Sequence, residues 1–124
     1  MTKSKIEALV SRAASSKTNS DYEELFLGLR GTELFFNVNS GGGANASPVS
    51  IPIVDAGSGF RAVLFFTSNE SEGLKKPFGG LVWEKVLEMV IKIPDADGLI
   101  IQNNETAWVG VDKMKAKNLL DAMA

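Results

Sequence analysis

The sequence contains no cysteine and no histidine. The absence of cysteine excludes disulfide bonds, thiolate metal sites and a cysteine nucleophile. Without histidine, the chain lacks the usual ligand of zinc and non-haem iron, the usual general base near neutral pH, and any Ser-His-Asp triad. Composition therefore excludes the commonest hydrolytic and metal-dependent mechanisms.

A strong net charge and a long apolar run are also missing. The net charge is −2, so no strong field draws the chain to nucleic acid or to an anionic membrane. The apolar patch from Ile6 to Val10 contains Glu7 and is too short for a secretory signal, and no later run approaches the length of a membrane span. We expect a cytoplasmic protein of a bacterium-like cell that binds neither nucleic acid nor membranes.

The remaining composition is that of an ordinary globular domain. The chain has 124 residues, of which 44% are apolar and 23% are charged, and this length suffices to bury a proper core. Because no internal repeat or linker interrupts it, we predict a single domain over residues 1–124. The glycine-rich segment 39–48 is predicted to be a flexible loop, and it lacks the pattern of a phosphate-binding loop.

Hydrophobic periodicity predicts an α+β fold. Helical spacing of apolar residues predicts helices over 4–14, 20–31, 79–93 and 113–123. In the last of these helices, the residues expected to face inward are Met114, Leu119, Leu120 and Met123. Strand-forming runs are found at 33–38, 49–54, 59–66, 98–102 and 106–111. The predicted order is helix, helix, three strands, helix, two strands, helix, with a mostly antiparallel or mixed sheet of about five strands and the helices packed on it.

Individual residues predict strand positions and helix caps. The second and third strands should form an antiparallel hairpin, and Pro52 places the second strand at or near a sheet edge. The run 62–66 is apolar at successive positions, which predicts a central strand covered on both faces. Ser20 with Glu23 fits a capping box, and Asp112 should cap the last helix.

The polar stretch after that central strand, Thr67-Ser68-Asn69-Glu70, has a structural and a functional interpretation. Thr67 with Glu70 fits a capping box that closes the strand, which is the favoured interpretation. The same side chains would alternatively form the rim of a recognition surface. A nucleophilic role for Ser68 needs a base, and only Lys75 and Lys76 lie near it in sequence, without any sign of burial.

Asp95-Ala96-Asp97-Gly98 suggests a calcium loop, but the register is wrong. Placing these aspartates at the third and fifth positions of an EF-hand puts Ile93 first and Asn104 twelfth, and neither supplies the required ligand. A turn that terminates the preceding helix is the better interpretation. No metal site and no cofactor are predicted.

Two tryptophans have different expected environments. Trp83 lies between apolar residues of a predicted helix and should pack in the core. Trp108 alternates with Val109, so one of the two faces out of the sheet, and a position in the core or at its edge is favoured for the tryptophan. A half-exposed tryptophan would be a good anchor for a partner.

Three segments in order resemble the N-terminal domain of the SseB (serine-sensitivity-enhancing) family of bacterial proteins: YEELFLGLRGTELFFNV, IPIV…FRAVLFFTSNE and PDADGLIIQN. Together they span roughly residues 21 to 104. Many members carry Asn-Pro after the late strand, where this chain has Gln102-Asn103. The resemblance implies no enzyme mechanism and no cofactor, and it points to a regulatory or interaction role.

Two functions of different classes follow. The first is a non-enzymatic interaction or regulatory domain that binds a protein partner or self-associates, with a candidate surface comprising Arg61, Thr67, Ser68, Glu70, Gln102, Asn103 and Trp108. The alternative is a small-ligand-binding or enzymatic domain that uses a polar rim of Arg61, Ser68, Glu70 and Asn103. No catalytic residue is predicted for the first function.

Overall fold

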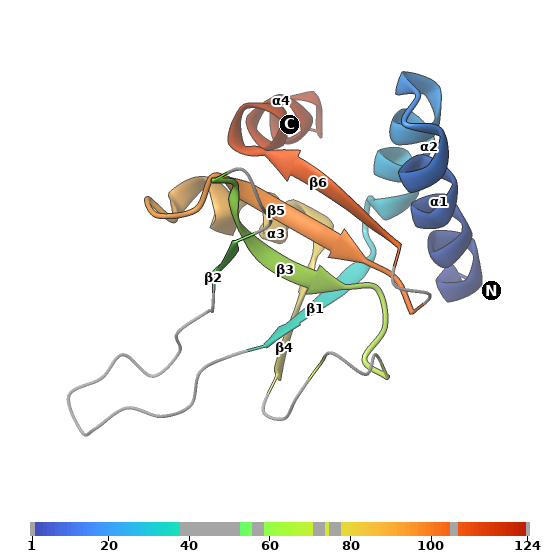
Figure 1. Cartoon of the computed structure of the whole chain (residues 1–124), viewed down its shortest axis with the longest axis horizontal. Coiled ribbons are helices and arrows are strands. Elements are labelled where there is room, and N and C mark those ends of the chain that lie inside the picture. The colour runs from blue at the N-terminus through green and yellow to red at the C-terminus, as the bar shows by residue number, and fades with distance from the viewer. Residues whose placement is uncertain are drawn as a thin grey trace.

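The computed structural model describes residues 2–37, 53–55, 59–70, 74, 78–104 and 107–123. These residues form four helices and six strands in an α+β fold (Figure 1). The helices are α1 (Thr2–Ser16), α2 (Asn19–Leu29), α3 (Trp83–Lys92) and α4 (Lys113–Met123). The strands are β1 (Glu33–Asn37), β2 (Ile53–Asp55), β3 (Arg61–Phe66), β4 (Phe78–Val82), β5 (Gly98–Gln102) and β6 (Trp108–Asp112). The predicted loop 39–48, Pro52, Lys75 and Lys76 lie outside the described residues.

The six strands form one mixed sheet in the order β4-β1-β3-β5-β6, with β2 paired to β3 beside β1. β3 and β5 run parallel, and the other pairs are antiparallel, including the predicted hairpin of β2 and β3. β1 and β2 follow each other along one edge of β3, because Phe35 pairs with Phe66 and Ile53 pairs with Val63. β3 is the predicted central strand, and four of its residues, from both alternations, are buried.

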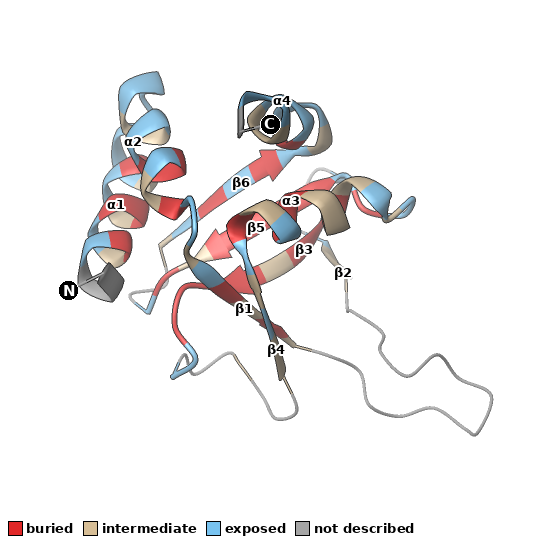
Figure 2. Cartoon of the chain, turned by 180° about the vertical axis from the view of Figure 1, so that it is seen from behind, coloured by how far each residue is buried: buried red, intermediate tan, exposed pale blue. Residues whose placement is uncertain are grey.

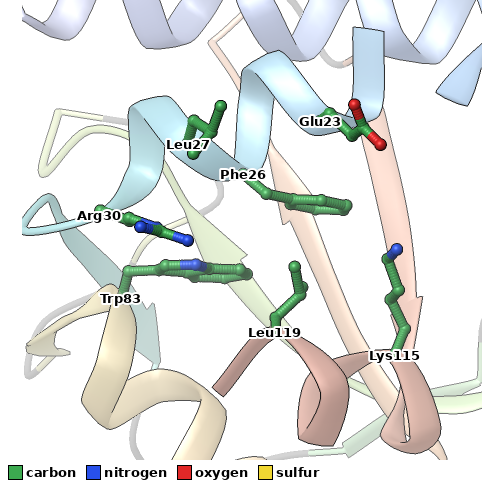
Figure 3. A pocket seen from close by; sticks show the side chains of 7 residues that line it. All are labelled: Glu23, Phe26, Leu27, Arg30, Trp83, Lys115 and Leu119. Atoms are coloured by element: carbon green, nitrogen blue, oxygen red, sulfur yellow. The ribbon is translucent and has the colours of Figure 1, made fainter. Parts of the chain in front are cut away.

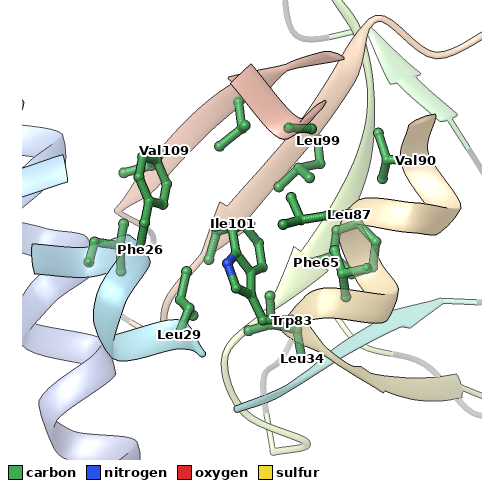
Figure 4. Packing of buried hydrophobic residues seen from close by; sticks show 14 of the residues in the cluster. Phe26, Leu29, Leu34, Phe65, Trp83, Leu87, Val90, Leu99, Ile101 and Val109 are labelled. Atoms are coloured by element: carbon green, nitrogen blue, oxygen red, sulfur yellow. The ribbon is translucent and has the colours of Figure 1, made fainter. Parts of the chain in front are cut away.

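The four helices cover one face of the sheet. Buried residues of each helix join one hydrophobic cluster with alternate strand residues, including Phe65, Ile101 and Val111. The helix α3 lies behind the sheet in Figure 1 and in front of it in Figure 2, where the buried helix faces turn inward. The predicted core residue Trp83 is fully buried in this cluster, beside Leu87 (Figure 4). The helices pack in two pairs, α1 with α2 and α3 with α4.

The strand β4 was not predicted from the sequence. Residues 78–82 pair with β1, and α3 begins only at Trp83 rather than at Gly79. The Trp83 N–H donates to the carbonyl oxygen of Thr32 at 2.9 Å, and Glu84 Oε1 accepts from the Gly31 N–H at 3.0 Å. These tertiary contacts fix the start of α3, since Val82 at its N-cap provides no side-chain hydrogen bond.

Of the helix caps predicted at Ser20 and Asp112, one is confirmed and one is wrong. Asp112 Oδ1 accepts from the Lys115 N–H at 2.7 Å and caps α4 as predicted. The cap of α2 is Thr18 rather than Ser20, since Thr18 Oγ1 accepts from the Asp21 N–H at 3.3 Å.

The helix α4 buries a different side chain from the one the sequence suggested. Ala116 is fully buried, whereas Met114, which was expected to face inward, is 75% exposed. Leu119 and Leu120 are half-buried against the core, as expected.

Candidate functional site

Two of the polar turns singled out in the sequence meet at one edge of the sheet. Thr67 and Ser68 follow β3, and Asn103 follows the parallel strand β5, so these residues emerge side by side. The Thr67 N–H donates to the carbonyl oxygen of Gln102 at 3.1 Å and joins the two turns. Thr67, Ser68 and Asn103, called here the strand-end cluster, are all buried. The carboxyl ends of parallel strands are the usual place for ligands in α/β sheets.

In this chain, α1 occupies that place. The Asn103 side-chain amide donates to the Glu7 carbonyl oxygen at 2.8 Å and to Ser11 Oγ at 2.8 Å. The Glu7 carboxylate accepts from the Asn104 N–H at 2.7 Å and from the Thr67 hydroxyl. The strand-end cluster therefore holds α1 against the sheet through hydrogen bonds.

Ser68 and Glu70 form a local turn rather than a capping box. The Glu70 N–H donates to Ser68 Oγ at 3.1 Å, while Thr67, the residue expected to cap, donates its hydroxyl to α1. The described residues that follow Thr67 form a turn and no helix, so Thr67 has no helix to cap there. Glu70 itself is exposed. The stretch therefore has a structural role, but through a local turn and a bond to α1 rather than through a capping box.

The remaining predicted site residues lie apart from the strand-end cluster. Arg61 is at the opposite end of β3 from Thr67, so the proposed polar rim of Arg61, Ser68, Glu70 and Asn103 does not come together. Gln102 is half-buried and pairs with Trp108 across β5 and β6. Trp108 is 50% exposed, whereas Val109 is buried, so the tryptophan is the residue of this pair that leaves the core.

The aspartate-rich turn before β5 has a structural role. Asp97 Oδ2 accepts from the Arg61 N–H at 3.0 Å, and the Asp97 carbonyl oxygen accepts from the Lys113 N–H at 2.9 Å. This single residue ties the starts of β3, β5 and α4 together. Within the described ranges, no three acidic side chains gather into a cluster suited to a metal ion.

A groove runs between the two helix pairs. Its apolar part encloses about 220 Å³ and is lined by Glu23, Phe26, Leu27, Arg30, Trp83, Lys115 and Leu119 (Figure 3). It continues toward the sheet into a more polar part of about 460 Å³, which α2 and Lys115 share with Gly110, Val111 and Asp112 of β6. The groove thus opens along the outer edge of β6.

Aromatic rings form one wall of the groove. Phe26 stacks on Trp83 with ring centroids 6.1 Å apart and on Tyr22 at 6.3 Å. Lys115 Nζ lies 5.7 Å from the centroid of Phe26 at the mouth of the groove, within reach of a cation–π interaction. Leu27 projects from the same helix and is 60% exposed. Apolar contact area is therefore available beside two cations, Arg30 and Lys115, and one carboxylate, Glu23.

Among the described residues, none pairs with the backbone of β6 on the side facing the groove. Asn103 donates its N–H to Ala107, and Lys113 donates its N–H to Asp97, so these two pairs are hydrogen-bonded pairs of the ladder. Hydrogen-bonded and non-bonded pairs alternate in antiparallel strands. The N–H and C=O groups of Trp108 and Gly110 therefore point away from β5. Neither residue's backbone hydrogen-bonds to any other residue in the described part of the chain.

The sheet face opposite the helices carries aromatic rings over glycines. A Cβ atom added at Gly110 would lie 3.7 Å from the Trp108 ring and 3.8 Å from the Phe60 ring. A Cβ atom added at Gly98 would lie 2.9 Å from Phe60 and only 2.0 Å from the carbonyl oxygen of Val111. The Trp108 ring thus lies beside Gly110 along the same edge strand that borders the groove.

No protein-family model, no curated protein and no solved structure matches the chain. The resemblance to the SseB family, which rests on the three sequence segments, accordingly stays a prediction. In the described part of the chain, no helix has both the length and the apolar character that a membrane crossing requires.

Sequence reasoning singled out Trp108, although it favoured a position in the core or at its edge, and it missed the groove. The groove combines α2, α3, β6 and α4, and no short motif marks it. One sign was present in α2, because Leu27 lies off the apolar face formed by Tyr22, Leu25, Phe26 and Leu29. A large apolar residue on the polar side of an amphipathic helix indicates a contact outside the core.

Proposed function

We propose that this chain is a non-enzymatic protein-interaction or regulatory domain, as its resemblance to the SseB N-terminal domain implies. The observation that carries the proposal is the groove between α2 and α4, which opens on the unpaired edge of β6. A cytoplasmic location in a bacterium belongs to the same proposal.

The exposed apolar residues support a protein partner. Leu27 lines the groove at 60% exposure, and Trp108 on the bordering strand is 50% exposed. Tryptophan is enriched among the few residues that carry most of the binding energy in protein interfaces, and leucine adds apolar contact area. The groove has a polar rim, which consists of the cations of Arg30 and Lys115 and the carboxylate of Glu23.

A small-molecule site has less support. The hydroxyl of Thr67 and the amide of Asn103, which would be the obvious polar contacts, already bind α1. This observation favours a partner that covers a surface over a ligand that enters a pocket at the strand ends.

Affinity capture from the native host's lysate tests the proposal. The wild-type chain should retain a specific protein, and Leu27→Lys should lose it because the charged group enters the apolar groove. Met114→Lys is the matched control, since Met114 is also an exposed apolar helix residue, at 75%, but does not line the groove. Equal capture by all three chains would contradict the proposed surface. Absence of any specific protein would contradict the function.

A further inference from the structure

We infer that the partner docks as an extended strand on the outer edge of β6, with a bulky apolar side chain inserted into the groove between α2 and α4. This inference rests on the proposed function and names the kind of segment that the surface accepts. The partner segment adds a strand to the sheet, which is a known mode of peptide recognition.

The edge itself selects a strand. The N–H and C=O groups of Trp108 and Gly110 face outward, and only another extended backbone pairs with both groups of alternate residues. A helix laid in the groove would have its own backbone groups satisfied internally and would leave this edge unpaired. The groove and the edge are continuous at Gly110 and Val111, so one strand reaches both.

The sequence of β6 also lacks the residue types that usually protect an edge strand. Such strands commonly carry lysine, proline or inward-pointing charges. The first four residues of β6 are Trp-Val-Gly-Val, and the single charged residue, Asp112, caps α4 through the Lys115 N–H. An edge strand without such residues is prone to pair with the strand of another chain.

Side-chain alternation sets the pattern of the partner segment. A residue placed opposite Val109 or Val111 would share their side of the sheet and point into the groove, toward Phe26. A residue opposite Gly110 would lie on the other face, next to Trp108. The segment should therefore carry a large apolar residue at a groove position and a small or flat residue at the next position.

A second copy of this chain does not meet these requirements. If β6 paired with β6 of another copy, the residues directed to the groove side would be Val109 and Val111 of that copy. Both are already buried in their own core, at 3% and 1% exposure, and neither is free to enter the groove. Pairing of β6 with its own copy is therefore excluded, and the inference commits to a different polypeptide with an unconstrained extended segment.

The inference is tested with a phage-displayed library of short random peptides, selected on the full chain. Enriched peptides should carry a large apolar residue at a groove position and a small or flat residue at the next position. Gly110→Pro should weaken their binding at least about tenfold, because it removes an outward N–H and places a ring in the path of the partner strand. Gly110→Ala is the matched control and should bind within about twofold, since its Cβ meets only ordinary contacts at 3.7 and 3.8 Å.

A second measurement covers the case in which Gly110→Pro does not fold. On the wild-type chain, a bound peptide should slow amide hydrogen exchange at Gly110, where the N–H becomes hydrogen-bonded. Peptides that bind Gly110→Pro as well as wild type, or that leave Gly110 exchange unchanged, would overturn the inference. If the library yields no peptide although lysate capture succeeds, the strand mode is wrong and the proposed function stands. If capture also fails, both are wrong.

Discussion

Replacing Asn103 with alanine should loosen α1 from the sheet. The Asn103 side chain is 2% exposed and links three parts of the fold. It donates to the Glu7 carbonyl oxygen and to Ser11 Oγ, both at 2.8 Å, and its Oδ1 accepts from the Ala107 N–H at 3.0 Å. Alanine removes all three bonds and leaves buried polar groups on both sides without this partner.

The expected cost follows from those bonds. Three hydrogen bonds at roughly 1 kcal/mol each, in a site too buried for full replacement by water, give a loss of about 3 kcal/mol in the free energy of unfolding. For a domain of this size, that loss corresponds to a fall of about 10 °C in the melting temperature. The damage should concentrate at α1, since the three bonds hold this helix and the turn beneath it.

Urea denaturation followed by circular dichroism gives the total loss, and amide hydrogen exchange shows whether α1 opens first. Asn104→Ala is the control, because the exposed Asn104 contributes its backbone N–H to Glu7 at 2.7 Å and alanine retains that group. The control should change the free energy by less than about 0.5 kcal/mol. If Asn103→Ala costs no more than Asn104→Ala, the strand-end cluster does not hold α1.

Two further predictions concern single positions. Gly98→Ala should lower the free energy of unfolding by about 3 kcal/mol, because its Cβ would lie 2.0 Å from the Val111 carbonyl oxygen. Gly110→Ala should be nearly neutral, since the nearest contact of its Cβ is at 3.7 Å. Thermal melts compare the two variants, and similar melting temperatures would refute the close approach at Gly98. Asp112→Ala should cost about 1 kcal/mol by removing the cap of α4, measured by urea denaturation, and an unchanged midpoint would show that Lys115 finds another acceptor.

The sequence predicted the helix and strand order well where local patterns were strong. β3 and β5 are continuous apolar runs, and α4 begins with a clear cap at Asp112. The strand β4 was missed because residues 79–93 fit a helical period throughout, and the break at Trp83 depends on pairing with β1. Such a boundary is set by tertiary contacts, which outweigh local propensity.

The candidate site was predictable only in part. That Thr67 and Asn103 lie near each other follows from their positions at the ends of two buried strands, provided the strands are parallel. Their engagement by Glu7 involves sequence separations of 60 and 96 residues, so no local pattern indicates it. The groove likewise depends on how the helix pairs pack on the sheet. Its one sign in the sequence was Leu27, an apolar residue on the polar side of α2.

The most direct measurement of the central claim is amide hydrogen exchange at β6 with and without the protein captured from the lysate. The account predicts that the partner slows exchange at Gly110 and Trp108, whose N–H groups face outward in the free chain. Slower exchange confined to other surfaces, with Gly110 and Trp108 unchanged, would contradict docking at this edge.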